Sequence, residues 1–408
     1  MKALVLCGGM SQICLIKHLK NKGIYTILAD MNSNAPAVKY ADTFYPISTL
    51  DVEGIRKIAI SEKVDYIMSV CADQMLFVTA QLSEELGLPC YIDYETAKNV
   101  SGKEYMKRIF VEHNIPTARY IVKESLSMDD VAGLQWPLIV KPVDCYSSKG
   151  VKKVNNEKEL MAAFAEAISY SRTNTAVIEQ YVDGEELSVD YYIENGEAKL
   201  LCARVLDKIP EGNGFIICRG KYPAPLTEEM YTEVVGIGQK IANAFCLTNT
   251  PMLVQMKVNG DNIKVIEFCS RTGGGIKYRL IPRVTGFDVV KAVLDLTLGD
   301  KPHYGGFHLN KYIIDEFLYC KPGTLDHLEG FKELLDEGVI VHYDQFKANG
   351  SAFKAIESSG SRVAYFSVEA DTLVELKQKQ RIAGERVKAI STTGEDLIRH
   401  DIIQFIPY

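Results

Sequence analysis

Short apolar runs alternate with longer amphipathic stretches over the first hundred residues. An apolar run bounded by turn residues favours a strand, and apolar residues spaced three or four apart favour a helix. The expected strands are "KALVLCGG", "YTILAD", "DYIMSVCA" and the short "PCYI", and the expected helices are "SQICLIKHLKNKG", "DVEGIRKIAISEKV" and "QMLFVTAQLSEELG". Strands that alternate with crossover helices predict an open parallel α/β sheet.

The pattern changes after a further helix at "KEYMKRIFVEHN". Many strands and few helices follow, which is typical of an α+β domain with antiparallel sheet. The expected strands are 138–143, 151–154, 176–182, 187–194, 197–206, 253–258 and 263–269, and the expected helices are 157–170 and 227–245.

The last hundred residues carry another α+β pattern. "RVAYFSVEA" predicts a strand, and "DTLVELKQKQRIAGERVKAI" predicts a helix. We therefore expect three domains: an open parallel α/β domain over residues 1–100, an α+β domain over 101–310 and a C-terminal α+β domain over 311–408.

The composition excludes several classes of protein. The 408-residue chain is 47% hydrophobic and 24% charged, which is ordinary for a globular enzyme, and its net charge of −7 argues against nucleic-acid binding. No apolar run reaches membrane length, and "MKALVLCGG" is interpreted as a buried first strand rather than a signal peptide. The ten cysteines form no C-x-x-C motif, so we expect a cytoplasmic protein without a disulfide framework or a zinc site.

Gly8-Gly9 after the first strand and Asp30 after the second imitate part of a dinucleotide-binding fold. The fingerprint G-x-G-x-x-G is absent, because "GGMSQI" lacks the later glycines. A tight strand-to-helix turn is the favoured interpretation, and NAD binding is not expected.

A lysine at the end of an apolar strand is the first candidate for chemistry. In "WPLIVKPVDCYSSKGVKKV", residues 136–154, the apolar run ends at Lys141 and a loop of small polar residues follows. A Walker A loop places its lysine after the glycines and opens a helix, whereas here the lysine comes first and a strand follows. The residue type suits phosphate, but the motif is a different one.

A predicted hairpin in "PMLVQMKVNGDNIKVIEFCSRTGGG", residues 251–275, is the second candidate. A three-residue loop would pair Gln255 with Glu267 on one face of the sheet, and a two-residue loop would put them on opposite faces. In the first register an amide oxygen and a carboxylate converge, and Mg²⁺ takes such oxygen donors together with phosphate oxygens. Arg271 is a fixed cation suited to phosphate, and the three glycines from Gly273 would let the backbone approach a ligand.

Between these two stretches lies "AVIEQYVDGEELSVDYYI", which by itself predicts a hairpin with a solvated acidic turn. The order of lysine strand, acidic hairpin and Glu/Arg hairpin resembles the ATP-grasp superfamily over nearly the whole chain. It is similar to the carboxylate–amine ligase branch, which includes phosphoribosylglycinamide synthetase, the L-amino-acid ligases, biotin carboxylase and the carbamoyl-phosphate synthetase large chain. The resemblance implies an ATP-grasp fold over 101–310, in which two α+β subdomains clasp ATP, preceded by the family's N-terminal α/β domain.

The resemblance also implies which residues bind the nucleotide. The implied set is Lys103 in "SGKEYMK", Lys141, Ser147, Ser148, Glu179, Gln180, Val182 and Glu186. The two lysines would contact the phosphates, and the loop 144–150 with its serines would close over them. The glutamate of "IEQYV" would meet the adenine amino group, the backbone of the next residues would meet the ring edge, and Glu186 would bind ribose hydroxyls.

For the reaction, the resemblance implies that Gln255 and Glu267 hold Mg²⁺, with Mn²⁺ as an alternative ion. Arg271, together with Lys141, would stabilise an acyl phosphate. Two departures from the family pattern stand out: the loop 144–150 has a single glycine, and Cys269 stands where the metal motif Glu-x-Asn has its Asn. A thiol is a poor ligand for a hard cation, so we expect Cys269 to pack as a small residue and not to bind the metal.

The implied activity is ATP-dependent joining of a small-molecule carboxylate to an amine through an acyl phosphate, with release of ADP and phosphate. The alternatives are a bicarbonate-using carboxylase or carbamoyl-type enzyme, and an ATP-binding regulatory protein without turnover. The expected partners are the two small-molecule substrates and a second copy of the chain, with no nucleic acid and no membrane. Arg204, Arg219, Arg279 and Arg283 could hold an acidic substrate or could equally form surface ion pairs.

Overall fold

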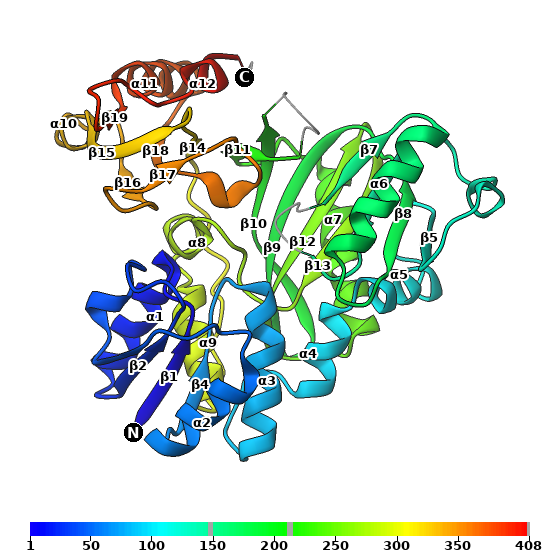
Figure 1. The fold of residues 1–408 in the computed structure, drawn as a ribbon, viewed down its shortest axis with the longest axis horizontal. Helices are drawn as coiled ribbons and strands as arrows, with labels where there is room; N and C mark the ends of the chain where they lie inside the picture. The colour runs from blue at the N-terminus through cyan, green and yellow to red at the C-terminus, as the bar shows by residue number, and fades with distance from the viewer. Residues whose placement is uncertain (146–149, 210–214, 406–408) are drawn as a thin grey trace.

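The N-terminal residues form a parallel four-stranded sheet with helices on its faces (Figure 1). In this computed structural model, which describes residues 1–145, 150–209 and 215–405, the strand order is β3-β2-β1-β4. The elements are β1 (Lys2–Leu6), α1 (Met10–Asn21), β2 (Tyr25–Ala29), η1 (Val38–Tyr40), β3 (Thr43–Tyr45), α2 (Val52–Glu62), β4 (Tyr66–Met68) and α3 (Asp73–Leu86). The expected open parallel α/β sheet is confirmed.

One expected strand of this region is wrong, and one strand lies outside the expected set. "PCYI" forms no strand; it leads into α4 (Tyr94–Ser101), which begins where the Asp93 side chain accepts a hydrogen bond from the backbone N–H of Thr96. The Tyr91 hydroxyl donates to the carbonyl of Ser270 instead, so this segment docks onto a distant part of the chain. The strand outside the expected set is β3, which is three residues long and therefore too short to show an apolar pattern in the sequence.

A second, antiparallel sheet of four strands lies apart from the first, in the order β5-β8-β6-β7. Its elements are α5 (Lys103–Glu112), which leads into it, β5 (Tyr120–Lys123), η2 (Met128–Val131), β6 (Leu138–Pro142), β7 (Lys152–Val154), α6 (Glu157–Tyr170) and β8 (Ala176–Gln180). The apolar face of α6 packs on β6 and β8 through Leu160, Ala163, Phe164 and Ala167.

A long antiparallel sheet of eight strands forms the centre of the molecule, in the order β13-β12-β9-β10-β11-β14-β18-β16. Its strands are β9 (Glu185–Glu194), β10 (Glu197–Lys208), β11 (Ile217–Tyr222), β12 (Thr250–Asn259), β13 (Asn262–Cys269), β14 (Tyr312–Leu318), β16 (His342–Gln345) and β18 (Ala364–Ala370). The helices between them are α7 (Glu228–Ala244), α8 (Lys277–Thr285) and α9 (Val289–Thr297). The strands and helices expected between 138 and 269 are present, with ends shifted by at most three residues; β5 and β11 lie outside the expected set.

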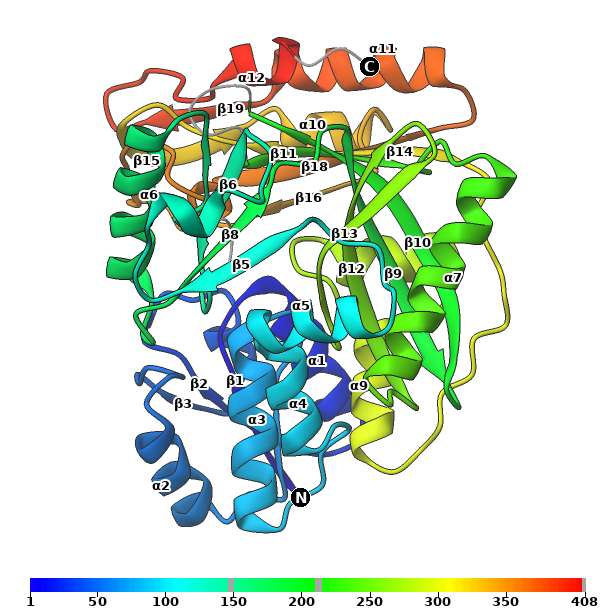
Figure 2. The same ribbon diagram turned by 90° about the vertical axis from the view of Figure 1, so that its right-hand side faces the viewer.

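The C-terminal residues add a three-stranded sheet, β17-β15-β19, and cover it with helices. The elements are β15 (Gly323–Glu329), α10 (Phe331–Asp336), β17 (Ala352–Phe353), η3 (Ser359–Ser361), α11 (Leu373–Arg386), β19 (Lys388–Ser391) and α12 (His400–Phe405). Figure 2 shows α11 and α12 at the end of the molecule opposite the N-terminal sheet. The boundary expected at residue 310 falls between strands of one sheet, and the three domain limits stay predictions.

Helix α9, from the second half of the chain, returns to the N-terminal sheet. Val290, Val293 and Leu294 of α9 are buried in the same hydrophobic cluster as Val5 of β1 and Leu15 of α1. The N-terminal block is thus packed against a segment almost three hundred residues away in the sequence. No helix in the described residues is long and apolar enough to cross a membrane.

The β12–β13 hairpin places Gln255 opposite Glu267 by a route that neither register expected from the sequence includes. Asn259 pairs with Asn262, so the connection is a two-residue turn. The register then shifts by one residue between the turn and Gln255, which leaves Ile266 as the extra residue of a β-bulge. The bulge brings the amide and the carboxylate back to directly opposed positions.

Gly184, which precedes β9, has a φ of +115°, and a Cβ there would lie 2.1 Å from the carbonyl oxygen of Val258. We expect Gly184→Ala to lower the free energy of unfolding by about 2–4 kcal/mol, because the backbone of β12 must move away. Gly196→Ala is the control: its φ is +86°, but no atom lies within 4 Å of the added carbon, so about 1 kcal/mol is expected. Urea unfolding measures both, and equal losses would contradict the steric explanation.

Candidate active site

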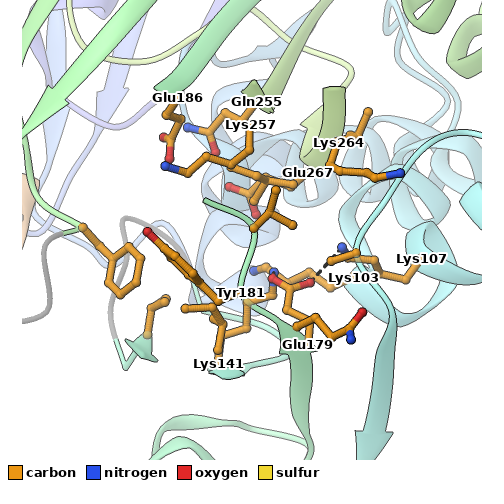
Figure 3. A pocket seen from close by; sticks show the side chains of 18 of the residues that line it. Lys103, Lys107, Lys141, Glu179, Tyr181, Glu186, Gln255, Lys257, Lys264 and Glu267 are labelled. Atoms are coloured by element: carbon orange, nitrogen blue, oxygen red, sulfur yellow. Dashed lines mark hydrogen bonds and ion pairs between the residues drawn. The ribbon is translucent and has the colours of Figure 1, made fainter. Parts of the chain in front are cut away.

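A cleft opens between the antiparallel four-stranded sheet β5-β8-β6-β7 and the strands of the long sheet that include β9, β12 and β13 (Figure 3). Among the described residues that line it, six are lysines and three are glutamates: Lys103, Lys107, Lys141, Lys208, Lys257, Lys264, Glu179, Glu186 and Glu267. The excess of positive charge suits a polyphosphate anion, and the apolar side chains of Ile139, Val151 and Val265 offer a surface for a flat ring.

Glu179 lines the cleft and lies between two lysines. Its Oε1 lies 2.5 Å from Nζ of Lys141, and its Oε2 lies 2.8 Å from Nζ of Lys107. All three side chains are buried. Burial by itself raises the pKa of Glu179, but the charges of Lys107 and Lys141 outweigh burial and hold the pKa at about 2. The carboxylate therefore stays charged, and both of its oxygens are engaged.

Lys107 was not among the residues singled out in the sequence. Burial lowers its pKa, while the charge of Glu179 opposes that effect. Its Nζ also donates to the hydroxyl of Thr117 at 2.7 Å, and that hydroxyl donates to the carbonyl of Val265 on β13. The spacing from Lys103 is the signal that could have revealed it, because residues four apart lie on one face of a helix. Lys103 itself donates to the carbonyl of Cys145 at 2.5 Å.

The remaining nucleotide-binding candidates lie at the C-terminal end of β8 and, across the cleft from Glu179, on β9. Gln180 at the end of β8 and Val182 two residues later line the cleft. Glu186 is buried on β9, and its Oε2 lies 2.5 Å from Nζ of Lys208. Figure 3 shows Glu186 and Gln255 on the side of the cleft opposite Glu179. The structure thus brings these candidates together around one cleft.

Two candidates cannot be placed. Ser147 and Ser148, and with them most of the loop 144–150, lie outside the described residues. Their contact with phosphate stays a prediction.

Gln255 and Glu267 present oxygen atoms to the cleft from neighbouring strands. In the part of the chain that the structure describes, neither side chain has a hydrogen-bond or ion-pair partner. A half-buried carboxylate without a partner, opposite an amide, is a suitable ligand pair for Mg²⁺ bound together with phosphate oxygens. Cys269 lies opposite Leu253, and burial raises the pKa of its thiol, which keeps the sulfur protonated.

A second pocket continues from the cleft and shares Lys103, Gln255 and Glu267 with it. Basic residues dominate its lining: Lys103, Arg204, Arg271, Lys277 and Arg362, against Asp73 and Glu267. The glycines at 273–275 also form part of its wall. The pocket therefore suits an anionic molecule placed next to the phosphate end of the cleft.

The cations of this pocket are held in different ways. Arg271 forms an ion pair with Asp73 of α3, and its Nη1 donates to the carbonyl of Thr272 at 2.6 Å. Arg204 pairs with Asp315 at 3.1 Å. Arg362 lies 3.8 Å from the centre of the Phe317 ring, and its Nε and Nη2 donate to the Tyr319 hydroxyl and the Ile217 carbonyl, both at 3.1 Å. It has no ion-pair partner among the described residues. Arg362 is therefore an arginine of this pocket whose charge no carboxylate of the described residues neutralises, and no pattern in the sequence marked it.

The other arginines considered in the sequence lie away from this pocket. Arg219 is buried against Glu316, Arg279 pairs with Asp344, and Arg283 pairs with Glu369. For Arg279 and Arg283 the expected surface ion pairs agree with the structure. Arg219 also forms an ion pair, but a buried one rather than a surface one.

Comparisons with known proteins agree with this geometry. Residues 134–279 match the ATP-grasp domain, and residues 4–90 match the PylC-like N-terminal domain. The chain is 26% identical over 336 residues to the formate-dependent phosphoribosylglycinamide formyltransferase of Methanocaldococcus jannaschii, covering 78% of this chain and 82% of that protein. It is 24% identical over 374 residues to the carbamoyl phosphate synthase large chain of Caldanaerobacter subterraneus, covering 86% of this chain and 34% of that protein.

Among solved structures, the L-amino acid ligase from Bacillus licheniformis superposes with a TM-score of 0.80 at 19% identity, covering 96% of this chain and 98% of that chain. This likeness shows the shared fold. The cleft between two antiparallel sheets and the two matched domains identify an ATP-grasp enzyme, and the proteins it is similar to include an L-amino acid ligase and a phosphoribosylamine–glycine ligase.

We expect Lys141→Met to weaken ATP binding by roughly 10- to 100-fold, the usual range for loss of one charged contact, and to abolish turnover. The fold should persist, because Lys107 still neutralises Glu179. Calorimetry with ATP measures the affinity, and circular dichroism checks the fold. Lys158→Met, on the exposed face of α6, is the control and should behave as the wild type. Unchanged ATP affinity in folded Lys141→Met would remove Lys141 from the site.

We expect Glu267→Gln to remove most activity, because it removes a negative charge from the predicted metal site. The magnesium concentration needed for half-maximal turnover should rise at least about tenfold. Cys269→Ser should cost little, since a buried protonated thiol contributes no charge. Cys269→Asn adds an oxygen donor and should lower the magnesium concentration needed for half-maximal turnover. A magnesium titration of ATP turnover compares the three variants; full activity in Glu267→Gln, or equal loss in Cys269→Ser, contradicts the assignment.

Proposed function

We propose that the enzyme uses ATP to convert a small-molecule carboxylate into an acyl phosphate, which an amine then attacks to form an amide, with release of ADP and phosphate. The continuity of the nucleotide cleft with the basic second pocket supports this reaction. Lys103, Gln255 and Glu267 line both spaces, so a phosphate in the cleft and an anion in the pocket would meet at that point. A carboxylate is a poor electrophile, and phosphorylation at the junction activates it.

In this proposal the lysines and the Gln255–Glu267 pair act on the phosphates. Lys103 and Lys141 neutralise charge on the phosphoryl oxygens, and Glu267 with Gln255 would hold Mg²⁺, or Mn²⁺ in its place. The metal supplies a further positive charge at the transferred phosphoryl group. Because both oxygens of Glu179 are engaged by lysines, the backbone at Gln180 and Val182 is the better candidate for the adenine edge.

Arg271 would stabilise the acyl phosphate from the second pocket. Its ion pair with Asp73 holds the guanidinium in place, because a paired side chain keeps few rotamers. Arg362, held against the Phe317 ring, is the candidate for the carboxylate of the substrate or for a second anionic group on it.

The relatives suggest the class of substrates. One matched protein is named as an L-amino acid ligase and another as a phosphoribosylamine–glycine ligase, so amino acids are the first acids to test, with amino acids and phosphoribosylamine as amines. We propose a cytoplasmic location, which the ten free cysteines support. A homodimer is also proposed, since a biotin carboxylase domain of this fold is described as a dimer.

We expect ADP release to require a carboxylate and an amine together. A coupled assay measures ADP with each amino acid alone, in pairs, and with phosphoribosylamine. The proposal predicts an increase of at least about tenfold over the ATP-only rate for one pair, without added bicarbonate. Lys141→Met is the matched inactive control.

Two outcomes would replace the proposal. ADP release that depends on bicarbonate and not on an amino acid would favour the carboxylase or carbamoyl-type reaction. ATP binding without release of ADP under any pairing would favour a regulatory protein.

A further inference from the structure

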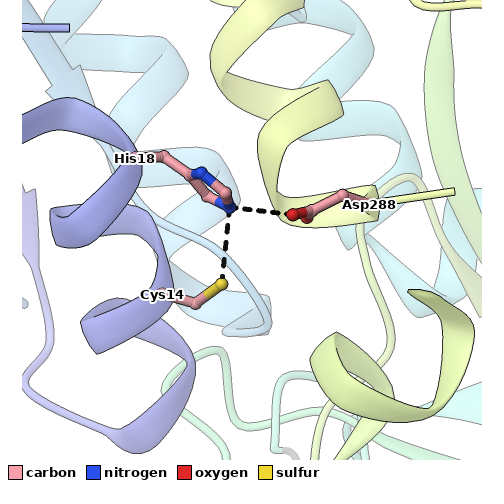
Figure 4. A group of neighbouring side chains, drawn as sticks. All are labelled: Cys14, His18 and Asp288. Carbon is pink, nitrogen blue, oxygen red and sulfur yellow. Dashed lines mark hydrogen bonds and ion pairs between the residues drawn. The ribbon is translucent and has the colours of Figure 1, made fainter. Parts of the chain in front are cut away.

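A second cluster of polar side chains lies away from the nucleotide cleft, between α1 and α9 (Figure 4). Cys14 and His18 project from α1, one turn apart, and Asp288 stands at the start of α9. Sγ of Cys14 lies 3.6 Å from Nε2 of His18, and Oδ2 of Asp288 lies 2.9 Å from the same nitrogen. All three atoms lie within 4.8 Å of one another. None of these residues lines the cleft or the second pocket.

The spacing of the three atoms fits one transition-metal ion. With zinc bonds of about 2.3 Å to sulfur and about 2.0–2.2 Å to nitrogen and oxygen, tetrahedral geometry separates sulfur from nitrogen by about 3.6 Å and nitrogen from oxygen by about 3.4 Å. The sulfur–nitrogen separation already has this value, and the nitrogen–oxygen separation of 2.9 Å would widen by about 0.5 Å on metal binding. Figure 4 shows the thiol and the carboxylate directed toward the same imidazole nitrogen.

The backbone holds the carboxylate in this direction. Oδ1 of Asp288 accepts hydrogen bonds from the backbone N–H groups of Val290 and Lys291, at 3.1 Å and 2.9 Å, as the N-cap of α9. Oδ2 is thereby turned toward His18. On α1, Cys14 and His18 share one helix face because they are four residues apart. Both helices pack on the same hydrophobic cluster, so the three ligands are carried by packed elements.

A cavity beside the cluster gives access for a fourth ligand. Cys14 and Asp288 line this cavity, which lies between α1, α8 and the strands β14 and β18. Its nearby cations have other partners: Nζ of Lys17 lies over the Tyr40 ring at 5.4 Å, and Arg283 pairs with Glu369. A water molecule from the cavity could complete a tetrahedral set without displacing a lysine or an arginine.

We propose that Cys14, His18 and Asp288 bind one Zn²⁺ ion. Thiolate with imidazole selects zinc or a similar transition ion over Mg²⁺, which prefers oxygen ligands. This proposal departs from the expectation from the sequence that no zinc site is present, and the proposed site is separate from the magnesium site proposed in the cleft. A bound ion would cross-link α1 to α9, and so join the N-terminal block to a segment that follows the β12–β13 hairpin.

The test titrates the full-length protein, freed of metal by a chelator, with Co²⁺ in the absence of ATP. Co²⁺ replaces Zn²⁺ in such sites, and a thiolate ligand gives it a charge-transfer absorption band. We expect one equivalent of Co²⁺ per chain to produce the band, one equivalent of Zn²⁺ to remove it, and excess Mg²⁺ to leave it unchanged. Absence of the band in the wild type overturns the proposal.

Matched variants separate ligation from folding. Asp288→Asn keeps the N-cap of α9, since Asn caps as well as Asp, but removes the charge; we expect affinity for Co²⁺ to fall at least about tenfold. Cys14→Ala should abolish the thiolate band, whereas Cys246→Ala, at an exposed cysteine, should not change it. Persistence of the band in Cys14→Ala overturns the site. Zinc should raise the unfolding temperature of the wild type but not of Cys14→Ala, a readout independent of ATP turnover.

Discussion

The nucleotide cleft depends on a single buried carboxylate held between two lysines. Glu179 comes from β8, Lys141 from β6 and Lys107 from α5, so one ion cluster fixes two strands and a helix around one point. A lysine buried without a counter-charge costs several kcal/mol or loses its proton. The low pKa of Glu179 keeps its charge in place. Because two lysines share one carboxylate, one positive charge remains for a phosphate group.

In the second pocket, too, ion pairs hold basic side chains in place, and here they join segments that are distant in sequence. Its Arg271 pairs with Asp73 of the N-terminal block, and its Lys277 forms an ion pair with Asp190 of β9, where burial lowers the pKa of the lysine to about 7. Arg362 reaches the pocket from the segment before β18. Three parts of the chain that are distant in sequence therefore supply its walls, and the pocket exists only when they are assembled. In the proposed reaction, this pocket would hold the anionic substrate next to the phosphate end of the cleft.

The return of α9 to the N-terminal sheet has a second consequence. Apolar residues of both segments form one cluster there. At the edge of this interface, Cys14 and His18 of α1 meet Asp288 at the start of α9. The packing that completes the N-terminal core thus also positions the proposed zinc ligands. An ion there would act on the relative position of the two segments rather than on the phosphates.

The sequence by itself determined most of the long strands and helices, because burial imposes periods of two and 3.6 residues that can be seen in the chain. It missed β3, β5 and β11, and the expected helix at 371–390 continued into what is β19. It also marked Lys141 and Glu267, because charged residues at the ends of apolar strands are conspicuous. It could not show the β-bulge that returns Gln255 to a position opposite Glu267, since a single extra residue in a ladder depends on how both strands pair. Nor could it show that Lys107 reaches Glu179 or that Arg362 faces the pocket. Long-range contacts depend on packing between elements, and tertiary structure alone decides them.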